Sequence, residues 1–283
     1  MRGIGVVGRI EATARAFGSA GAVAIGLAKR HRNYRRFIVV APPRSGSTML
    51  CRTLSKHPEL ISYEELFNES LIGWGPAYPS PLFRQAPLHQ LRRQNPVDFL
   101  RRHVWCDQPL SIKAVGFKML YNQILHSNNF DVAEYFSLDR SFEILHLTRR
   151  SLLRAYLSSV KTQRTGVSQK SAGQLDHADR PVTLDPHALV RYIVGMRRWH
   201  ARIDTLFEGH DIYRLEYGHM VSNWTTVRAD IFKHLGVSPI DVAPAVERLS
   251  TLSLRESIEN YGFVADVLAD FGFENEILDD CPV

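Results

Sequence analysis

The sequence of 283 residues contains only three cysteines, Cys51, Cys106 and Cys281. They form no CxxC pair, and no histidine stands near them at the spacing of zinc ligands. A disulfide framework and a zinc site are therefore not expected, and sparse unpaired cysteines fit a reducing compartment. We accordingly expect a cytoplasmic protein that requires no metal.

Long apolar runs are also scarce near the N-terminus. Residues 16–28 are weakly apolar, but a membrane-spanning helix needs about 20 such residues. Their length resembles the apolar region of a signal peptide, yet Glu11 and Arg15 precede them closely and a basic cluster stands where cleavage would occur. A packing helix and a helix on a membrane surface both remain open. We expect an N-terminal helical extension over residues 1–35, with peripheral membrane contact through residues 1–36 as one alternative.

Lysine is scarce although the chain is basic. Only seven of the 35 basic residues are lysines and the other 28 are arginines, with a net charge of +6 and a pI near 9.3. The planar guanidinium group suits phosphate and sulfate oxygens, although an arginine-rich solvated surface would give the same count. The charge is scattered and is not interleaved with aromatic residues, so nucleic acid is not the expected partner.

The lysine of a nucleotide triphosphatase is missing from the stretch FIVVAPPRSGSTML, residues 37–50. An apolar run at 36–41 predicts a buried strand, which Pro42 and Pro43 end before a helix over 47–56. A Walker A loop needs Gly-Lys followed by Ser or Thr, and this stretch has Gly-Ser-Thr. ATP hydrolysis with Mg²⁺ is therefore not expected here.

The same stretch nevertheless has the features of an anion-binding loop. Gly46 permits close backbone approach, and successive N–H groups ahead of a helix form an anion-binding nest. The candidate ligands are Arg44, Ser45, Gly46, Ser47 and Thr48. A serine-rich N-cap of the helix would explain the same residues without a ligand.

Alternating strands and helices follow along the rest of the chain. We predict strands at 59–67, 111–120, 141–150 and 211–216, and helices after 150 and at 187–208, 223–235 and 253–270, with a loop at 162–186. Such alternation predicts an α/β fold with a mostly parallel central sheet between helical layers. We find no internal repeat and no linker, so residues 36–283 are expected to form one domain.

A second anion-binding group follows the strand at 141–150. Arg149 and Arg150 end this strand, and Ser158 lies eight residues after Arg150, about two turns into the next helix. A guanidinium at the strand end can reach the same anion as Ser158. An arginine near a helix start and a solvent-facing serine would explain the pair structurally.

Together these motifs resemble sulfotransferases that use 3′-phosphoadenosine 5′-phosphosulfate (PAPS), especially bacterial carbohydrate sulfotransferases of the nodulation-factor and trehalose type. PxRSGST is similar to their 5′-phosphosulfate loop, and LTRRSLLRAYLSS to their 3′-phosphate motif. Further blocks, including HPELISYEELFN and LRESIENYGFV, occur in the expected order over about residues 36–264. The resemblance implies a three-layer P-loop-like fold and transfer of a sulfuryl group from PAPS to a carbohydrate or glycolipid hydroxyl. It places Arg44–Thr48 on the phosphosulfate and Arg150 with Ser158 on the 3′-phosphate.

The sequence lacks the general-base motif that part of this family uses. The Lys-x-His motif of the cytosolic animal enzymes and their late Arg-Lys-Gly segment are both absent. The trehalose enzyme is similar in having a glutamate at the distance from its loop arginine that separates Glu65 from Arg44. This implies Glu65 as base and Arg44 as a catalytic cation. Glu64 competes, but neighbouring strand side chains point to opposite faces, so only one of the two should face the cleft.

Two other functions stay open from the sequence. One is a nucleotide-dependent kinase with a degenerate phosphate loop, and the other is a non-catalytic basic protein that binds nucleic acid or a membrane surface. Arg255, Glu259 and Asn260 in the late block are further candidates for closing over the donor or acceptor. The sequence also allows a homodimer.

Overall fold

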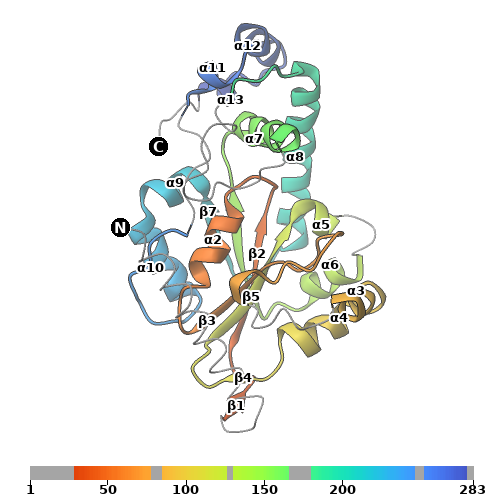
Figure 1. Cartoon of the computed structure of the whole chain (residues 1–283), viewed down its shortest axis with the longest axis vertical. Coiled ribbons are helices and arrows are strands. Elements are labelled where there is room, and N and C mark those ends of the chain that lie inside the picture. The colour runs from red at the N-terminus through yellow and green to blue at the C-terminus, as the bar shows by residue number, and fades with distance from the viewer. Residues whose placement is uncertain (1–28, 78–84, 126–129, 166–179, 246–251, 279–283) are drawn as a thin grey trace.

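A parallel sheet of five strands organises the protein. The computed structural model describes residues 29–77, 85–125, 130–165, 180–245 and 252–278. The strands are β2 (Arg35–Ala41), β3 (Leu60–Glu65), β5 (Ala114–Leu120), β6 (Phe142–Thr148) and β7 (Ile212–Glu216), in the order β3-β5-β2-β6-β7. Figure 1 shows helices on both faces of this sheet. The predicted α/β fold with a parallel sheet between helical layers is therefore confirmed.

The central strand β2 explains this order. Residues 37–41, FIVVA, are completely buried, so the strand needs partners on both edges and cover on both faces. It pairs in parallel with β5 on one side and with β6 on the other. The loop after β2 consequently lies at the middle of the carboxyl edge, where ligands of open α/β sheets bind.

A short antiparallel pair lies at the opposite end of the sheet. Strand β1 (Arg30–His31) pairs with β4 (Gln108–Pro109). Residues 30–31 and the start of β2 at Arg35 fall within the expected helical extension 1–35, and they are extended. The weakly apolar segment 16–28 lies outside the described residues, and so does most of the segment considered for membrane contact.

The helices form a layer on each face and a third group at the carboxyl edge. They are α2 (Ser47–Leu54), α3 (Gln85–Gln94), α4 (Pro96–Phe99), α5 (Tyr121–Leu125), α6 (Phe130–Leu138), α7 (Leu152–Thr165), α8 (Pro186–Leu206), α9 (Tyr217–Ser222), α10 (Trp224–His234), α11 (Leu254–Ser257), α12 (Tyr261–Asp270) and α13 (Asn275–Leu278), with a 3₁₀ turn η1 (Gly75–Ala77) and a π-helical turn η2 (Leu100–Val104).

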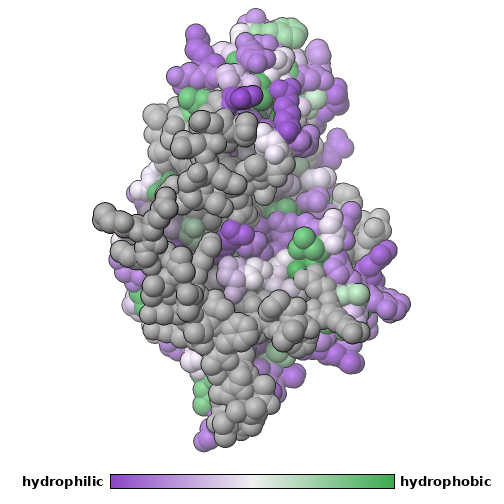
Figure 2. All heavy atoms as spheres, in the orientation of Figure 1, coloured by the Kyte–Doolittle hydropathy of each residue, from purple (hydrophilic) through white to green (hydrophobic). Residues whose placement is uncertain are grey.

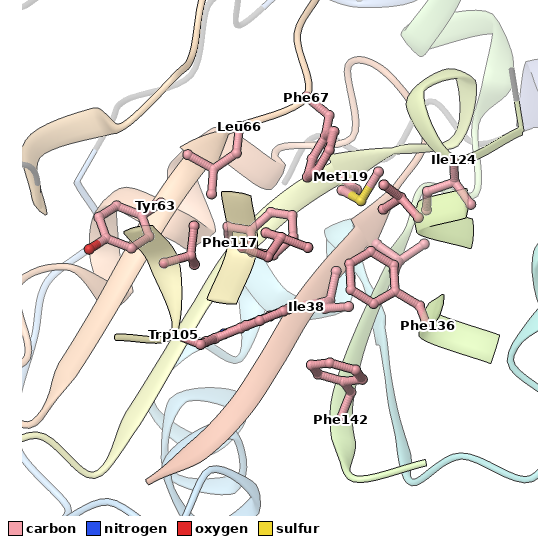
Figure 3. Packing of buried hydrophobic residues seen from close by; sticks show 14 of the residues in the cluster. Ile38, Tyr63, Leu66, Phe67, Trp105, Phe117, Met119, Ile124, Phe136 and Phe142 are labelled. Atoms are coloured by element: carbon pink, nitrogen blue, oxygen red, sulfur yellow. The ribbon is translucent and has the colours of Figure 1, made fainter. Parts of the chain in front are cut away.

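The two faces of the sheet bury separate cores. Alternate residues of β2, Phe37, Val39 and Ala41, contact side chains of α2, α9 and α10. Ile38 and Val40 face the opposite layer, where an aromatic core forms around Phe117. Figure 3 shows this core, with Phe67, Trp105, Phe136 and Phe142 also labelled. The period-two alternation of β2 thus determines both layers.

A third core lies beyond the carboxyl edge. Helices α7, α8, α11 and α12 share a separate buried cluster, and Figure 1 shows them above the strand ends. The helix predicted over 253–270 is interrupted, because Ile258 pairs with Val182 in an isolated bridge instead of continuing the helix. The predicted loop at 162–186 begins later than expected, since α7 extends to Thr165, and residues 166–179 lie outside the described ranges.

The coloured surface on the face shown in Figure 2 is mainly polar. In Figure 2 hydrophilic residues dominate the coloured part of the visible face, and hydrophobic residues occur singly or in small groups. Among the helices of the described ranges, none combines the length and the apolar character required to cross a bilayer.

Candidate active site

The loop between β2 and α2 has a strained backbone. Arg44 has φ of 63° and Gly46 has φ of 86°, so both occupy the left-handed region. A non-glycine residue there is uncommon and is retained only where the surroundings hold it. Here the Arg149 guanidinium donates a hydrogen bond from Nη1 to the Arg44 carbonyl oxygen at 2.8 Å. The arginine predicted at the end of β6 therefore fixes the loop conformation.

The start of α2 points to a ligand rather than to a simple cap. Its N-cap residue is Gly46, and no side chain caps its first turn in the described part of the chain. The alternative reading of the serines as an N-cap is therefore wrong. Ser45 is fully buried, and its hydroxyl makes no hydrogen bond to any described residue. Ser47 is also buried, so neither serine is open to solvent.

Gly46 allows close contact with α9. A Cβ atom at this position would lie 2.5 Å from two ring carbons of Tyr217. The Tyr217 ring itself stacks with Arg149, whose guanidinium carbon lies 4.9 Å from the ring centroid. The loop glycine, the tyrosine and the arginine therefore support one another.

We expect Gly46→Ala to disrupt this loop, because alanine adds both a steric clash and an unfavourable φ. The free energy of unfolding should fall by about 1–3 kcal/mol, and nucleotide binding should weaken with it. Chemical denaturation measures the first effect and a binding titration the second. Gly195→Ala in α8 is the matched control, since its Cβ would meet nothing within 4 Å. Equal stability of the two variants would contradict the role given to Gly46.

Arg44 connects the loop to α7. Its Nε donates to the Ser158 hydroxyl at 3.0 Å. Burial lowers the pKa of Arg44, while the nearby Glu65 and Tyr192 oppose this shift. A guanidinium stays protonated despite such a shift, so the site retains a half-buried positive charge.

The structure gives Ser158 a different partner from the predicted one. Ser158 contacts Arg44, whereas the backbone N–H of Arg150 donates to Glu216 at 3.3 Å and Arg150 itself is exposed. Arg150 still lies at the strand-to-helix junction expected from the sequence. The two proposed anion sites therefore meet through the contact between Arg44 and Ser158.

Glu65 is the carboxylate that reaches this loop. Its Oε1 lies 2.9 Å from the Lys118 ammonium, and its Oε2 accepts hydrogen bonds from Gln123 at 2.9 Å and from Asn68 at 3.2 Å. Burial alone would raise the pKa of Glu65, but Lys118 and these hydrogen bonds outweigh it and lower that pKa. The side chain is therefore held as a carboxylate in a defined orientation.

Lys118 is a candidate site residue that the sequence-based set does not contain. Its side chain is only 1% exposed. Its Nζ donates to the Thr48 hydroxyl at 2.8 Å and contacts Glu65, so one ammonium joins the anion loop to the carboxylate. The signal was present in the sequence, because a charged residue inside an apolar strand rarely stays buried without a partner.

Glu64 faces elsewhere. Its Oε1 lies 2.6 Å from Nε of Arg52 on α2. The two carboxylates therefore have different partners, and Glu65 is the one beside Lys118. The late-block residues have other partners. Asn260 exchanges two hydrogen bonds with Leu184, and Arg255 stacks on Tyr261.

This geometry combines a nest of backbone N–H groups, two cations and a carboxylate at the centre of the carboxyl edge. Such a site can bind a phosphate or sulfate group and remove a proton from a neighbouring hydroxyl. The model of the Sulfotransferase family matches residues 36–241, and the chain belongs to this family. Membership of this family makes the protein a transferase of sulfuryl groups.

Solved structures similar to this chain include three sulfotransferases. A sulfotransferase from Alicyclobacillus acidocaldarius is 16% identical over 87% of this chain and 97% of its own, with a TM-score of 0.47. Sulfotransferase STF9 from Mycobacterium avium is 13% identical over 92% of this chain and 80% of its own, with a TM-score of 0.40. Mouse sulfotransferase SULT7A1, solved in complex with PAP, is 12% identical over 79% of this chain and 65% of its own, with a TM-score of 0.39. A search of curated protein sequences finds no match.

Proposed function

We propose that this protein transfers the sulfuryl group of PAPS to a hydroxyl of a carbohydrate or glycolipid, without a metal ion. The observation that carries the proposal is the position of Lys118, which joins Thr48 of the anion loop at 2.8 Å to Glu65 at 2.9 Å. A donor phosphosulfate held by the loop and an acceptor hydroxyl beside Glu65 would therefore be neighbours.

The loop would hold the donor through groups that are already oriented. Arg44, Ser45, Gly46, Ser47 and Thr48 are the proposed ligands of the 5′-phosphosulfate. Bound PAPS supplies a sulfuryl group on a good leaving group, so the protein needs positioning and positive charge more than covalent chemistry. The fixed N–H groups and Arg44 would stabilise the charge that develops on the leaving phosphate.

Glu65 would act as the general base. As the acceptor oxygen bonds to sulfur and the bond from sulfur to the phosphate oxygen breaks, the acceptor proton passes to Glu65. Its two oxygens accept from three groups and retain lone-pair capacity for this proton. Lys118 keeps the group ionised until the acceptor arrives, because it lowers the pKa of Glu65.

Arg150 and Ser158 are the proposed contacts of the 3′-phosphate. Arg150 is exposed at the junction between β6 and α7, and Ser158 lies further along that helix beside Arg44. A ligand carrying two phosphate groups fits two adjacent cationic positions better than a mononucleotide does. Other arginines would have to complete this site, because the late segment of the animal enzymes is absent.

An open pocket between the loop after β3 and helix α3 is the proposed place for a sugar-like acceptor. Its volume is about 770 Å³, and Glu69, His89, Gln90 and Arg93 are among the residues that line it. Asn68 connects it to the base, since Asn68 donates to Glu65 and accepts from the Ser70 N–H. Amide, carboxylate and guanidinium groups suit the hydroxyls of a carbohydrate.

Thermal unfolding with added nucleotides tests the donor. We expect adenosine 3′,5′-bisphosphate to raise the melting temperature without Mg²⁺, because a ligand that binds only the folded state stabilises it by mass action. ADP and ATP should give smaller shifts. A shift by ATP with Mg²⁺ but none by the bisphosphate would favour a kinase and contradict the proposal.

Arg150→Ala separates the two phosphate sites in the same measurement. The variant should lose most of the shift given by the bisphosphate and retain the shift given by adenosine 5′-phosphate. An equal loss for both ligands would remove the assignment of Arg150 to the 3′-phosphate. A shift that disappears steeply with salt for every anion would instead indicate a non-catalytic basic protein.

Labelled PAPS with a panel of glycans and glycolipids then identifies the acceptor.

A further inference from the structure

Three metal-ligating side chains meet at the end of the sheet opposite the candidate active site. Glu143 is the second residue of β6, Asp211 directly precedes β7, and His234 is the last residue of α10. One donor atom from each lies within 4.8 Å of the other two. The loop at Arg44 follows the carboxyl ends of the strands, so this cluster lies about a strand length away from it.

Two of the three donor atoms are buried without a hydrogen bond. Glu143 Oε2 and His234 Nε2 are shielded from solvent, and neither has a hydrogen-bond partner among the described residues. They face each other at 3.4 Å, at the distance of an ion pair but without hydrogen-bond geometry. A buried polar atom without a partner costs about 1–3 kcal/mol, so its presence in a native site calls for a ligand or a proton.

The spacing of these atoms fits a bound cation. Ligand atoms at about 2.0–2.1 Å from a tetrahedral Zn²⁺ stand roughly 3.3–3.4 Å from one another. The separation of 3.4 Å between Glu143 Oε2 and His234 Nε2 meets this requirement without movement. Asp211 is exposed, so its carboxylate can complete the set while water takes the fourth position.

The surroundings also hold the ligands in place. Arg35 Nη1 donates to Glu143 Oε1 at 2.6 Å, which leaves Oε2 directed at the histidine. The same guanidinium atom donates to the His234 carbonyl oxygen at 2.9 Å and anchors the end of α10. The backbone oxygen of Asp211 accepts from the Ile144 N–H at 3.0 Å. In metal sites, hydrogen bonds of this kind to the metal-binding residues orient the side chains that bind the ion.

Charge favours a divalent ion here. Two carboxylates and the negative end of α10 outweigh the single positive charge of Arg35. The balance of these charges is negative, and a cation would relieve it.

We propose that Glu143, Asp211 and His234 form a zinc-binding site that joins β6, the start of β7 and α10. The metal is structural, because the candidate catalytic groups lie at the other edge of the sheet. This proposal differs from the sequence-based expectation in one respect only. No cysteine takes part, so the spacing patterns that exclude a cysteine-based zinc site do not apply to it.

Isothermal titration of the metal-free, untagged protein with Zn²⁺ tests this site. We expect one equivalent to bind and the melting temperature to rise, and Co²⁺ should give the visible absorption of a tetrahedral site. His234→Gln and Asp211→Asn should each weaken zinc binding by at least about 100-fold, the upper end of the loss seen for outer contacts. Asp211 is exposed, so its variant tests the site even if the histidine variant folds poorly.

His219→Gln and Asp230→Asn are the matched controls, since both residues are exposed and lie outside the cluster. These variants should bind zinc like the unaltered protein. The proposal is overturned if no saturable binding occurs, in which case Glu143 and His234 form only an ion pair with a proton. It is equally overturned if the cluster variants keep full zinc affinity. Neither result bears on sulfuryl transfer, which the nucleotide titrations test separately.

Discussion

Glu65→Gln should lower kcat for sulfuryl transfer by about 10²–10⁴ while leaving nucleotide binding nearly unchanged. Glutamine keeps the size and most hydrogen bonds of the side chain, but it cannot accept the acceptor proton. The bisphosphate contacts proposed at Arg44 and Arg150 do not involve Glu65. Initial rates with labelled PAPS and a melting-temperature titration with the bisphosphate measure the two quantities on the same preparation.

Glu64→Gln is the control for this change. Glu64 lies next in sequence and is paired with Arg52, so its loss should alter stability slightly and kcat by no more than a few fold. If Glu64→Gln abolished transfer and Glu65→Gln did not, the base would be reassigned to Glu64. If Glu65→Gln instead abolished bisphosphate binding, Glu65 would be a structural residue of the loop.

The strand, loop and helix around Arg44 could be predicted closely from the sequence. The strand expected at 36–41 covers Arg35–Ala41, and the helix expected at 47–56 covers Ser47–Leu54. The reason is local: the apolar β-branched run and the two prolines restrict the backbone, and the glycine permits the left-handed turn, all independently of distant contacts. The different partners of Glu64 and Glu65 coincide with a shift in the register of β3 against β5 between Ser62 and Glu65, which the local alternation does not predict.

The missed features depend on residues that are distant in the sequence. Lys118 is buried because β5 lies beside both β2 and β3, which brings it to Thr48 and Glu65. No local pattern specifies those neighbours. Ser158 contacts Arg44 because α7 lies over the loop, and a spacing of eight residues from Arg150 could not show this.

The interruption of the last predicted helix has the same origin. Val182 and Ile258 are 76 residues apart in the sequence. One backbone hydrogen bond lies on each side of their bridge, from the Val182 N–H to the Ser257 oxygen and from the Glu259 N–H to the Val182 oxygen. These bonds replace helical ones. The apolar periodicity over 253–270 is compatible with a continuous helix, so only the tertiary contact determines that the helix is interrupted at Ile258. The site therefore combines a locally encoded anion loop with cationic and carboxylate partners supplied by the topology.

Lys118→Met should impair both stability and catalysis. Methionine retains the apolar stem but removes the ammonium that contacts Thr48 and Glu65. Removing one partner of a fully buried ion pair costs about 3–5 kcal/mol, and the cost here should be smaller, about 1–3 kcal/mol, because Glu65 is 24% exposed. Lys113→Met is the matched control, since Lys113 pairs with Glu59 while 46% exposed and should contribute at most about 1 kcal/mol.

The pH dependence identifies how Lys118 acts. In the folded protein Lys118 helps to lower the pKa of Glu65 below its ordinary value. This shift stabilises the fold above the unfolded pKa, and the stabilisation is lost as pH falls through the folded pKa. Without Lys118 the pKa of Glu65 should rise, so the acid limb of kcat against pH should move to higher pH and the acid-dependent loss of stability should shrink. Lys113→Met should leave the limb in place. A large fall in kcat with an unmoved acid limb would contradict this role and would place the action of Lys118 on the donor.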